Sequence, residues 1–440
     1  MIKIDTKSIN TILKLLNSFL RGETEIKSNE YYSDPIISHY YNEIIRYWSQ
    51  LNYIIKKTLR SLDNSNLREI EKAKLLYMTY RIIHEKSSKQ ELLSELSIFK
   101  SDITFIDKLY TFSWKIALEN KNTDERLSIE KAIPQFLIEH LKPVMSYDLF
   151  IDTIKNVNNY NLDNKLFFRI NSLANIENPK ILLDSIKESF HKNRIIINKD
   201  LEIPELFFTL NKYKKRILKT HYYKNGKIIF QDKASATVIY LLSPQPGEII
   251  CDMCAAPGGK TSLISQYSKN KSRIIAIDIN TKRLRIAQRL LNKLFVKNSF
   301  LINTDSINTP ISYDSLFDKV LIDAPCTGSG ALLTQPELKW RQNSEFLHQN
   351  VVLQEKLIHN GLKLLKPGGT IVYSTCSLYP EEGELQIMKF LNDLEPLKIP
   401  KWLSPCYKIK NLQIEGAGRL FPSIHKTQGF FIAKFKKKLK

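Results

Sequence analysis

The sequence predicts an α/β protein whose second half forms a doubly wound, mainly parallel sheet, preceded by an all-helical domain and a small α+β domain. From residue 226 onward, short apolar runs typical of buried strands alternate with longer stretches of helical spacing. Glycine is nearly absent from residues 44–83, where apolar residues recur at helical spacing. Loops rich in small residues and proline follow several of the apolar runs, where the strands of such a sheet end.

The first domain is expected to span residues 1–150 and to contain only helices. Trp48, Leu51 and Ile55 share one face of a helical pattern, as expected for side chains that face a core. Residues 147–163 are richer in Asn and Asp and lack a long period. We therefore expect a linker there.

An α+β domain is expected over residues 160–220. Leu166–Ile170 has the composition of a strand, and Asn178 followed by Pro179 is typical of a helix N-terminus. Residues 195–197 and 206–210 are two further predicted strands. The domain ends in a basic run with tyrosines between its charges, formed by Lys212, Tyr213, Lys214, Lys215, Arg216, Lys219, Tyr222 and Tyr223. Such a run is either a solvated face or an RNA contact in which rings stack on bases and cations meet phosphates.

Composition favours a polyanionic partner, and the lysine-rich residues 434–440 are predicted to form a basic tail that contacts phosphates. The chain of 440 residues carries a formal net charge of +21, although its many Lys, Ile and Asn residues also fit a biased genome. Five widely spaced cysteines indicate reduced thiols. The absence of a long uncharged apolar run and of an amino-terminal signal segment predicts a cytoplasmic protein that does not bind membranes.

The segment Asp252–Thr261 is the most informative loop of the chain. It follows the apolar run Ile249–Cys251 and precedes an amphipathic stretch, so it reads as strand, tight loop and helix start. Its small residues and paired glycines let the backbone approach a ligand. A P-loop is disfavoured because Cys254 stands where the first glycine is required. Cys251 and Cys254 form a single C-x-x-C pair, for which ordinary packing is favoured over metal or redox chemistry.

Two acids predict a nucleoside-bearing ligand. Asp278 ends the run 274–277, about twenty residues after the glycine loop, where a carboxylate accepts hydrogen bonds from ribose hydroxyls. Asp305 follows the run 299–302 and is placed to meet an adenine amino group. The alternative for each is a surface acid that closes a loop.

Two thiols predict covalent chemistry on a base. Cys326 follows Asp323, and Cys376 lies within Ser374–Ser377, each just after an apolar strand. A thiolate that adds to carbon-6 of cytosine makes carbon-5 nucleophilic toward an electrophilic methyl group. Either thiol could be that nucleophile, Asp323 could assist at ring N3, and a base must later remove the carbon-5 proton. The alternative is a pair of inert core cysteines.

At these residues the sequence resembles the Sun/RsmB family of S-adenosylmethionine-dependent RNA (cytosine-5) methyltransferases. The resemblance rests on the segments 231–235, 252–261, 317–330, 366–377 and 419–431. It implies a Rossmann-like class I methyltransferase domain in which Cys376 is the nucleophile, Cys326 takes part in product release, and Asp323 contacts both cofactor and target base. It also implies no metal and a set of residues that hold S-adenosyl-L-methionine: Cys254, Ala255, Ala256, Pro257, Gly258, Gly259, Lys260, Asp278, Asp305 and Asp323, with Arg283 a weaker candidate.

The resemblance also implies the domain plan and the partner. Residues 1–150 are similar to NusB-like extensions of the RsmB branch, 160–220 to RRM-like ones, and 221–440 form the methyltransferase domain. An RNA partner follows, with ribosomal RNA favoured over transfer RNA and a monomer expected. Gly383 and Gln428 depart from the family pattern. Two alternatives remain, a DNA- or amino-methylating relative that needs no thiol and a non-catalytic RNA-binding ribosome-assembly factor.

Overall fold

A computed structural model describes residues 4–23, 31, 34–59, 67–96, 100–159, 164–175, 178–309 and 316–439. The chain divides into two compact units. The first contains Met1–Glu139 together with Thr334–Arg341, and the second contains His140–Leu333 and Gln342–Lys440. The predicted division into domains 1–150, 160–220 and 221–440 stays a prediction about independently folding parts.

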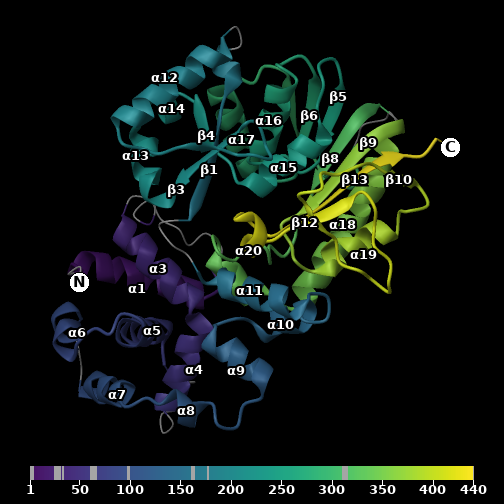
Figure 1. Cartoon of the computed structure of the whole chain (residues 1–440). Helices are drawn as coiled ribbons and strands as arrows, with labels where there is room; N and C mark the ends of the chain where they lie inside the picture. Colours follow the sequence, from purple (N-terminus) through teal and green to yellow (C-terminus); the bar gives the residue numbers. More distant parts are fainter. Residues whose placement is uncertain are drawn as a thin grey trace. The chain divides into compact units, whose positions relative to one another are not determined.

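The described elements of the first unit are helices, as predicted (Figure 1). Leu51 and Ile55 are buried in its core, and Trp48 packs against that core. The resemblance to NusB stays a prediction. The helices are α1 (Thr6–Leu20), α3 (Pro35–Arg46), α4 (Trp48–Thr58), α5 (Glu69–Ile83), α6 (Lys89–Glu95), α7 (Lys100–Tyr110), α8 (Trp114–Ala117), α9 (Thr123–Glu130) and the start of α10 (Gln135–Leu141).

The segment Thr334–Arg341 belongs to the helical unit although its sequence neighbours belong to the other. The Lys339 side chain is fully buried, and its Nζ donates to the backbone carbonyls of Arg46 at 2.8 Å and Ala132 at 3.0 Å. Trp340 Nε1 donates to the carbonyl of Ile45 at 2.6 Å. Burial holds the pKa of Lys339 well below its ordinary value. Sequence periodicity could not predict that Thr334–Arg341 belongs to the helical unit, because its contacts are with residues 200 or more positions earlier in the chain.

The second unit begins with a helix where a linker was predicted. Helix α11 spans Tyr147–Val157, and the Ser146 hydroxyl caps it by accepting from the N–H of Leu149 at 3.4 Å. Phe150 and Ile154 are buried on one face, so an amphipathic period persists beneath the polar composition. The linker prediction is therefore wrong for this helix, and residues 160–163 lie outside the described ranges.

The α+β region contains a four-stranded antiparallel sheet in the order β2-β3-β1-β4. The strands predicted at 166–170 and 206–210 and the helix at Pro179 are confirmed. No strand forms at 195–197, because the N–H of Ile195 bonds back to the Phe190 carbonyl at 2.8 Å and closes the helix end. The elements are β1 (Lys165–Ile170), η2 (Ser172–Asn175), α12 (Pro179–Lys192), β2 (Asn198–Lys199), β3 (Leu206–Leu210), η3 (Asn211–Tyr213), α13 (Lys214–Lys219), α14 (His221–Lys224) and β4 (Ile228–Phe230). The likeness to an RRM stays a prediction.

The large sheet has the order β11-β12-β13-β9-β8-β5-β6-β7, with β10 paired to β13. Strands β9, β8, β5, β6 and β7 run parallel, and β13 joins them antiparallel (Figure 1). The sheet is thus mixed. Antiparallel strands at one side of an otherwise parallel sheet are common in large α/β folds. Its strands are β5 (Ile249–Asp252), β6 (Arg273–Asp278), β7 (Ser299–Asn303), β8 (Phe317–Asp323), β9 (Leu365–Thr375), β10 (Leu394–Pro396), β11 (Ser404–Pro405), β12 (Ala417–Leu420) and β13 (Phe430–Lys437).

Successive strand residues enter two different cores, so the sheet is covered on both faces. Ile250 lies in the core with α15 and α16, whereas Cys251 lies in the core with α18. The chain leaves β5 toward β6 and later returns to β8 on the other side of β5, which places the switch of strand order at β5. The helices of this part are α15 (Lys233–Leu242), α16 (Gly259–Tyr267), α17 (Thr281–Lys293), η4 (Pro336–Arg341, in the first unit), α18 (Ser344–Leu364), η5 (Pro380–Glu382), α19 (Glu384–Met388) and α20 (Pro422–His425).

The lysines near the carboxyl terminus do not form a free tail. Residues 434–437 lie in β13, between β9 and β12. Lys437 Nζ donates to the carbonyls of Leu362 and Leu365, at 2.7 and 2.8 Å. The prediction of a basic tail over 434–440 is therefore wrong for these residues, and Lys440 lies outside the described ranges. In the described part of the chain, no helix combines the length and the apolar character that crossing a membrane requires.

Candidate active site

The loop after β5 is fixed from two neighbouring strands. The N–H of Met253 donates to the carbonyl of Leu321 on β8 at 3.0 Å, and the N–H of Ala255 donates to the carbonyl of Ile277 on β6 at 2.9 Å. Gly258 has a φ of +97°, and a Cβ there would meet the side chain of Ala287 at 3.3 Å. Glycine is therefore required at this turn, after which α16 begins. The predicted residues 254–260 thus lie at the carboxyl edge of the sheet.

Asp278 lies beside this loop, as predicted. Its carboxylate accepts from the N–H of Ala256 at 3.0 Å and from the N–H of Asn280 at 2.9 Å. Arg283 donates from Nη2 to the carbonyl of Ala256 at 2.5 Å. Because a carboxylate has about four acceptor positions, Asp278 keeps capacity for a ligand.

The loop after β7 also meets the loop after β5. Asp305 Oδ1 accepts from the N–H of Ile307 at 2.9 Å, and the Ser306 hydroxyl donates to the carbonyl of Met253. Ile279 is 68% exposed at the end of β6, next to Asp278. Sequence reasoning did not select Ile279, although a large apolar residue directly after a strand-end acid was the signal that could have found it.

A second buried carboxylate, Asp252, lies beneath the same loop. Its Oδ2 accepts from the Thr261 hydroxyl at 2.7 Å, while its Oδ1 is buried without a hydrogen-bond partner among the described residues. Burial, together with the charges of Asp323 and Asp278, raises the pKa of Asp252 to about 7, although the Thr261 hydrogen bond and Lys260 oppose this rise. Three carboxylates, Asp252, Asp278 and Asp323, thus share the site with two cations, Lys260 and Arg283.

The two predicted thiols lie together. Cys326 Sγ and Cys376 Sγ are 3.3 Å apart, because β8 and β9 are adjacent and their loops remain bonded, with the N–H of Gly330 donating to the Cys376 carbonyl at 2.9 Å. The hydrogen bond to Cys376, followed by burial, holds the pKa of Cys326 well above its ordinary value. Either sulfur can be the donor in this contact.

Asp323 and Lys260 join the thiols to the loop after β5. Lys260 Nζ lies 2.7 Å from Asp323 Oδ2, and the Ser374 hydroxyl donates to Asp323 Oδ1 at 2.8 Å. Burial opposes the charge on Lys260, but Asp323 and Cys376 hold its pKa above the ordinary value. The structure therefore brings together a cation, a carboxylate and both cysteines.

The C-x-x-C pair shows ordinary burial. Cys251 is fully buried and Cys254 partly exposed, and burial, followed by the charge of Asp252, raises the pKa of both thiols. Within the described ranges, no group of three or more His, Cys, Asp and Glu side chains is arranged to hold a metal ion.

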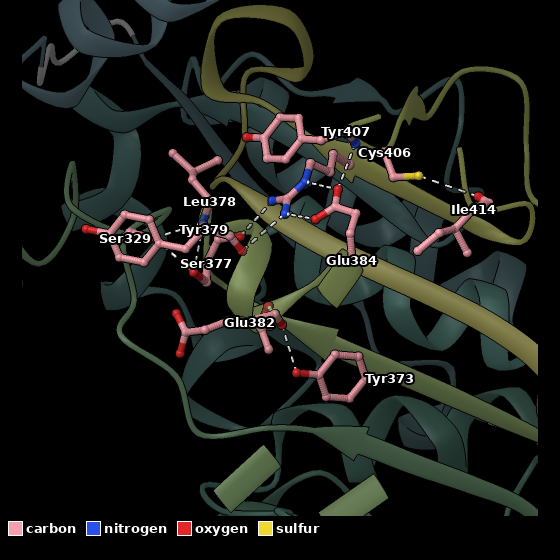
Figure 2. A network of polar contacts seen from close by, with 12 residues as sticks. Ser329, Tyr373, Ser377, Leu378, Tyr379, Glu382, Glu384, Cys406, Tyr407 and Ile414 are labelled. Atoms are coloured by element: carbon pink, nitrogen blue, oxygen red, sulfur yellow. Dashed lines mark hydrogen bonds and ion pairs between the residues drawn. The ribbon is translucent and has the colours of Figure 1, made fainter. Parts of the chain in front are cut away.

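Sequence reasoning missed an ion pair beneath the Cys376 loop. Arg419 and Glu384 are both fully buried, with Arg419 Nη2 2.5 Å from Glu384 Oε2. Arg419 also donates to the carbonyls of Ser377 at 3.0 Å and Tyr379 at 3.3 Å, and Glu384 accepts from the N–H of Tyr407 at 2.7 Å (Figure 2).

Gly383 explains one departure from the family pattern. A Cβ at this position would approach Arg419 Nη2 and the ring of Phe431 to 2.8 Å each. Any larger residue would therefore require the buried pair to shift.

The parallel strands with their switch at β5, the glycine loop after β5 and the acid that ends β6 define a Rossmann-like methyltransferase fold. Residues 239–436 match the model of the family described as 16S rRNA methyltransferase RsmB/F. Within this matched part, the chain is a methyltransferase domain of the Sun/RsmB family.

Curated relatives match the catalytic half. A probable ribosomal RNA small subunit methyltransferase B of Synechocystis sp. is 37% identical over 213 residues, which are 47% of this chain and 47% of the relative. A 28S rRNA (cytosine-C(5))-methyltransferase of Mus musculus is 34% identical over 227 residues, or 49% of this chain and 28% of the relative. The chain thus spans about half the length, or less, of these curated relatives.

Solved structures resemble more of the chain. The crystal structure of PH0851 has a TM-score of 0.80 and 26% identity, and the match covers 99% of this chain and 100% of that one. A methyltransferase homolog protein from Pyrococcus horikoshii has a TM-score of 0.60 and 31% identity, covering 72% of this chain and 99% of that one.

Proposed function

We propose that this protein is an S-adenosylmethionine-dependent RNA (cytosine-5) methyltransferase that acts on ribosomal RNA. The observation that carries the proposal is the pair of thiols 3.3 Å apart, next to the Lys260–Asp323 pair at the carboxyl ends of β8 and β9. The names of the relatives support RNA as the substrate and carbon-5 of cytosine as the target. Transfer RNA is the alternative substrate.

The residues of the loop fit S-adenosyl-L-methionine. Asp252 Oδ1 is a buried acceptor without a partner among the described residues, and the three carboxylates of Asp252, Asp278 and Asp323 outnumber the two cations of the site, Lys260 and Arg283. A ligand with an ammonium and a sulfonium group satisfies both features. Residues 254–260 would hold the amino-acid part, Asp278 the ribose hydroxyls, and Asp305 with Ile279 the adenine. When bound, the cofactor supplies an electrophilic methyl group to a carbon nucleophile.

We assign the covalent steps to the two thiols. After the Cys376 thiol has lost its proton to water, its Sγ forms a bond to carbon-6 of cytosine, and the π electron pair of the carbon-5–carbon-6 double bond moves to carbon-5 while Asp323 supports ring N3. In the last step Cys326 removes the proton from methylated carbon-5, the double bond re-forms, and Cys376 leaves as a thiolate. Once Cys376 is a thioether, it no longer stabilises the Cys326 proton as a thiolate would. Cys326 can then release its own proton to water, and the resulting thiolate is the base that takes the carbon-5 proton.

Three outcomes of one incubation test the proposal with the wild-type chain. Incubation with S-adenosylmethionine and RNA, followed by nucleoside mass spectrometry, should yield 5-methylcytosine, with separated ribosomal and transfer RNA identifying the substrate. Methylation of an amino group would favour the amino-methylating alternative. RNA binding without methyl transfer to either RNA would favour an assembly factor.

A basic surface of the α+β region is the RNA contact we propose outside the catalytic centre. Lys215 and Arg216 are exposed on α13, and Arg216 lies 5.8 Å from the ring of Tyr213. A cavity of about 390 Å³ next to them adds Lys192 and Arg194 from the end of α12, and no acid lines it. Besides the basic run seen in the sequence, the proposed RNA contact therefore includes Lys192 and Arg194, which precede that run by about twenty residues.

This surface predicts a change in salt dependence. Lys215→Gln/Arg216→Gln should lower the slope of log K against log salt by about 1.4 to 1.8, because each lost phosphate contact removes about 0.7 to 0.9. A filter-binding titration from low to high salt measures it. Lys269→Gln/Lys271→Gln removes the same charge from two exposed lysines between α16 and β6, outside the basic surface, and should leave the slope unchanged. Equal slopes in all three proteins would remove this surface from the proposal.

A further inference from the structure

The buried side chain of Glu382 holds the loop that carries Cys326. Its carboxylate accepts from the N–H of Thr327 at 2.9 Å and from the Thr327 hydroxyl at 2.5 Å. Gln354 on α18 donates from Nε2 to the same carboxylate at 2.9 Å and to the carbonyl of Pro325 at 2.8 Å. Pro325 and Thr327, the residues on either side of Cys326, are therefore both bonded to the pair formed by Glu382 and Gln354.

The backbone of Glu382 holds the end of the strand that leads to Cys376. Its carbonyl accepts from the Tyr373 hydroxyl at 2.8 Å and from the Thr375 hydroxyl at 3.2 Å (Figure 2). Thr375 directly precedes Cys376. One residue thus bonds to the sequence neighbours of both cysteines.

A second set of bonds closes the same frame. The hydroxyls of Ser329 and Ser377 are 3.0 Å apart, and Ser329 also accepts from the N–H of Leu378 at 2.8 Å. These contacts join the segment after Cys326 to the segment after Cys376. Glu382 contributes the carboxylate of this frame, through its bonds to Thr327.

The burial of Glu382 needs a reason beyond packing. Its side chain has no exposed surface, and a carboxyl group without water is costly unless donors satisfy it. Burial raises the pKa of Glu382, and the hydrogen bonds from Ser377, Thr327 and Gln354 lower it again in part. An apolar residue of similar volume could fill the same space but could not bond to Thr327. The carboxyl group therefore serves the geometry of the two loops.

We propose that Glu382 is a positioning residue that fixes the separation of the Cys326 and Cys376 thiols. It bonds to their neighbours and not to the sulfurs, so it acts through the loops. The inference rests on the proposed function, in which Cys376 adds to the base and Cys326 assists release of the same base. Both thiols must then reach one ring, and a displacement of about 1 Å is enough to lower such a rate about 100-fold.

The first test measures thiol proximity and needs neither RNA nor activity. Diamide takes one hydrogen from each of two thiols, becoming the hydrazine while the sulfurs form a disulfide. In the wild type, Cys326 and Cys376 should form this bond readily, as mapped by peptide mass spectrometry. Glu382→Ala should slow it at least about tenfold, and Glu382→Gln, which keeps one acceptor, should fall between.

Glu381→Gln is the matched control. Glu381 is the adjacent carboxylate, 32% exposed, and its contact is with His140 at 3.9 Å. In the Glu381→Gln variant, Cys326 and Cys376 should form their disulfide at the wild-type rate. Should Glu382→Ala fail to fold, as judged by circular dichroism, the folded Glu382→Gln variant decides. Wild-type disulfide rates in the folded Glu382 variants would overturn the inference.

The second test separates positioning from substrate binding. Where wild type methylates RNA, Glu382→Ala should lower kcat about 100-fold and Glu382→Gln should lower it less, with KM for RNA and cofactor unchanged in both. A rise in KM with unchanged kcat would contradict a positioning role. If wild type makes no 5-methylcytosine but the disulfide rates differ as expected, the proposed function fails and the role of Glu382 in thiol geometry stands.

Discussion

Cys376→Ala is expected to abolish 5-methylcytosine formation, whereas Cys326→Ala is expected to leave RNA covalently attached to the protein. The Cys376 sulfur lies 3.3 Å from the Cys326 sulfur, and it is close enough to Lys260 to help hold the Lys260 pKa above its ordinary value. Without this nucleophile the carbon-5 position of cytosine stays unreactive, and the rate should fall at least about 10⁴-fold. Nucleoside mass spectrometry measures the loss.

The Cys326 variant tests the second step. Removing Cys326 leaves the addition intact but removes the base for the carbon-5 proton, so the adduct should accumulate. A denaturing gel should then show a slower band that disappears after nuclease treatment. The double variant Cys326→Ala/Cys376→Ala should show no such band, because the bond to RNA is made by Cys376.

Cys406→Ala is the control for loss of a buried thiol. Cys406 Sγ contacts the carbonyl of Ile414 at 3.5 Å, and burial raises its pKa. This variant should methylate RNA at the wild-type rate. Persistent methylation by Cys376→Ala would instead assign the nucleophile to Cys326, or favour chemistry that needs no thiol.

The loops that carry the proposed chemistry were predictable because their signals are local. A run of apolar residues followed by Asp252–Thr261 specifies a strand, a turn and a helix start within a few residues. The acids at 278 and 305 and both cysteines follow strands in the same way, and parallel strands bring their carboxyl ends to one edge. Local pattern and sheet topology together were enough to place them.

The elements that were mispredicted depend on contacts that are distant in sequence. Residues 434–437 have the composition of a basic tail, yet they pair with β9 and β12. Helix α11 is amphipathic within a polar stretch where a linker was predicted. Glu382 shows the same limit within the site, because a carboxylate in the sequence carries no sign that donors from two loops will surround it.

Arg419→Met is expected to destabilise the second unit by about 3 to 5 kcal/mol. Arg419 and Glu384 have no exposed surface, and Glu384 keeps the Arg419 pKa above its ordinary value despite the opposing effect of burial. Removing the guanidinium leaves the Glu384 carboxylate buried without its cation, and the carbonyls of Ser377 and Tyr379 lose their donor. The midpoint of urea unfolding should fall accordingly.

A double variant separates the loss of charge balance from the loss of packing. Arg419→Met/Glu384→Leu removes both charges and should recover much of the lost stability, because apolar residues of similar volume often replace a buried ion pair at little cost. Lys389→Met removes one partner of an exposed pair, 2.6 Å from Glu355, and should change the midpoint little. If the double variant is as unstable as Arg419→Met, the bonds to Ser377 and Tyr379 dominate over the charge. Its methylation rate would then stay low, since those bonds support the loop of Cys376.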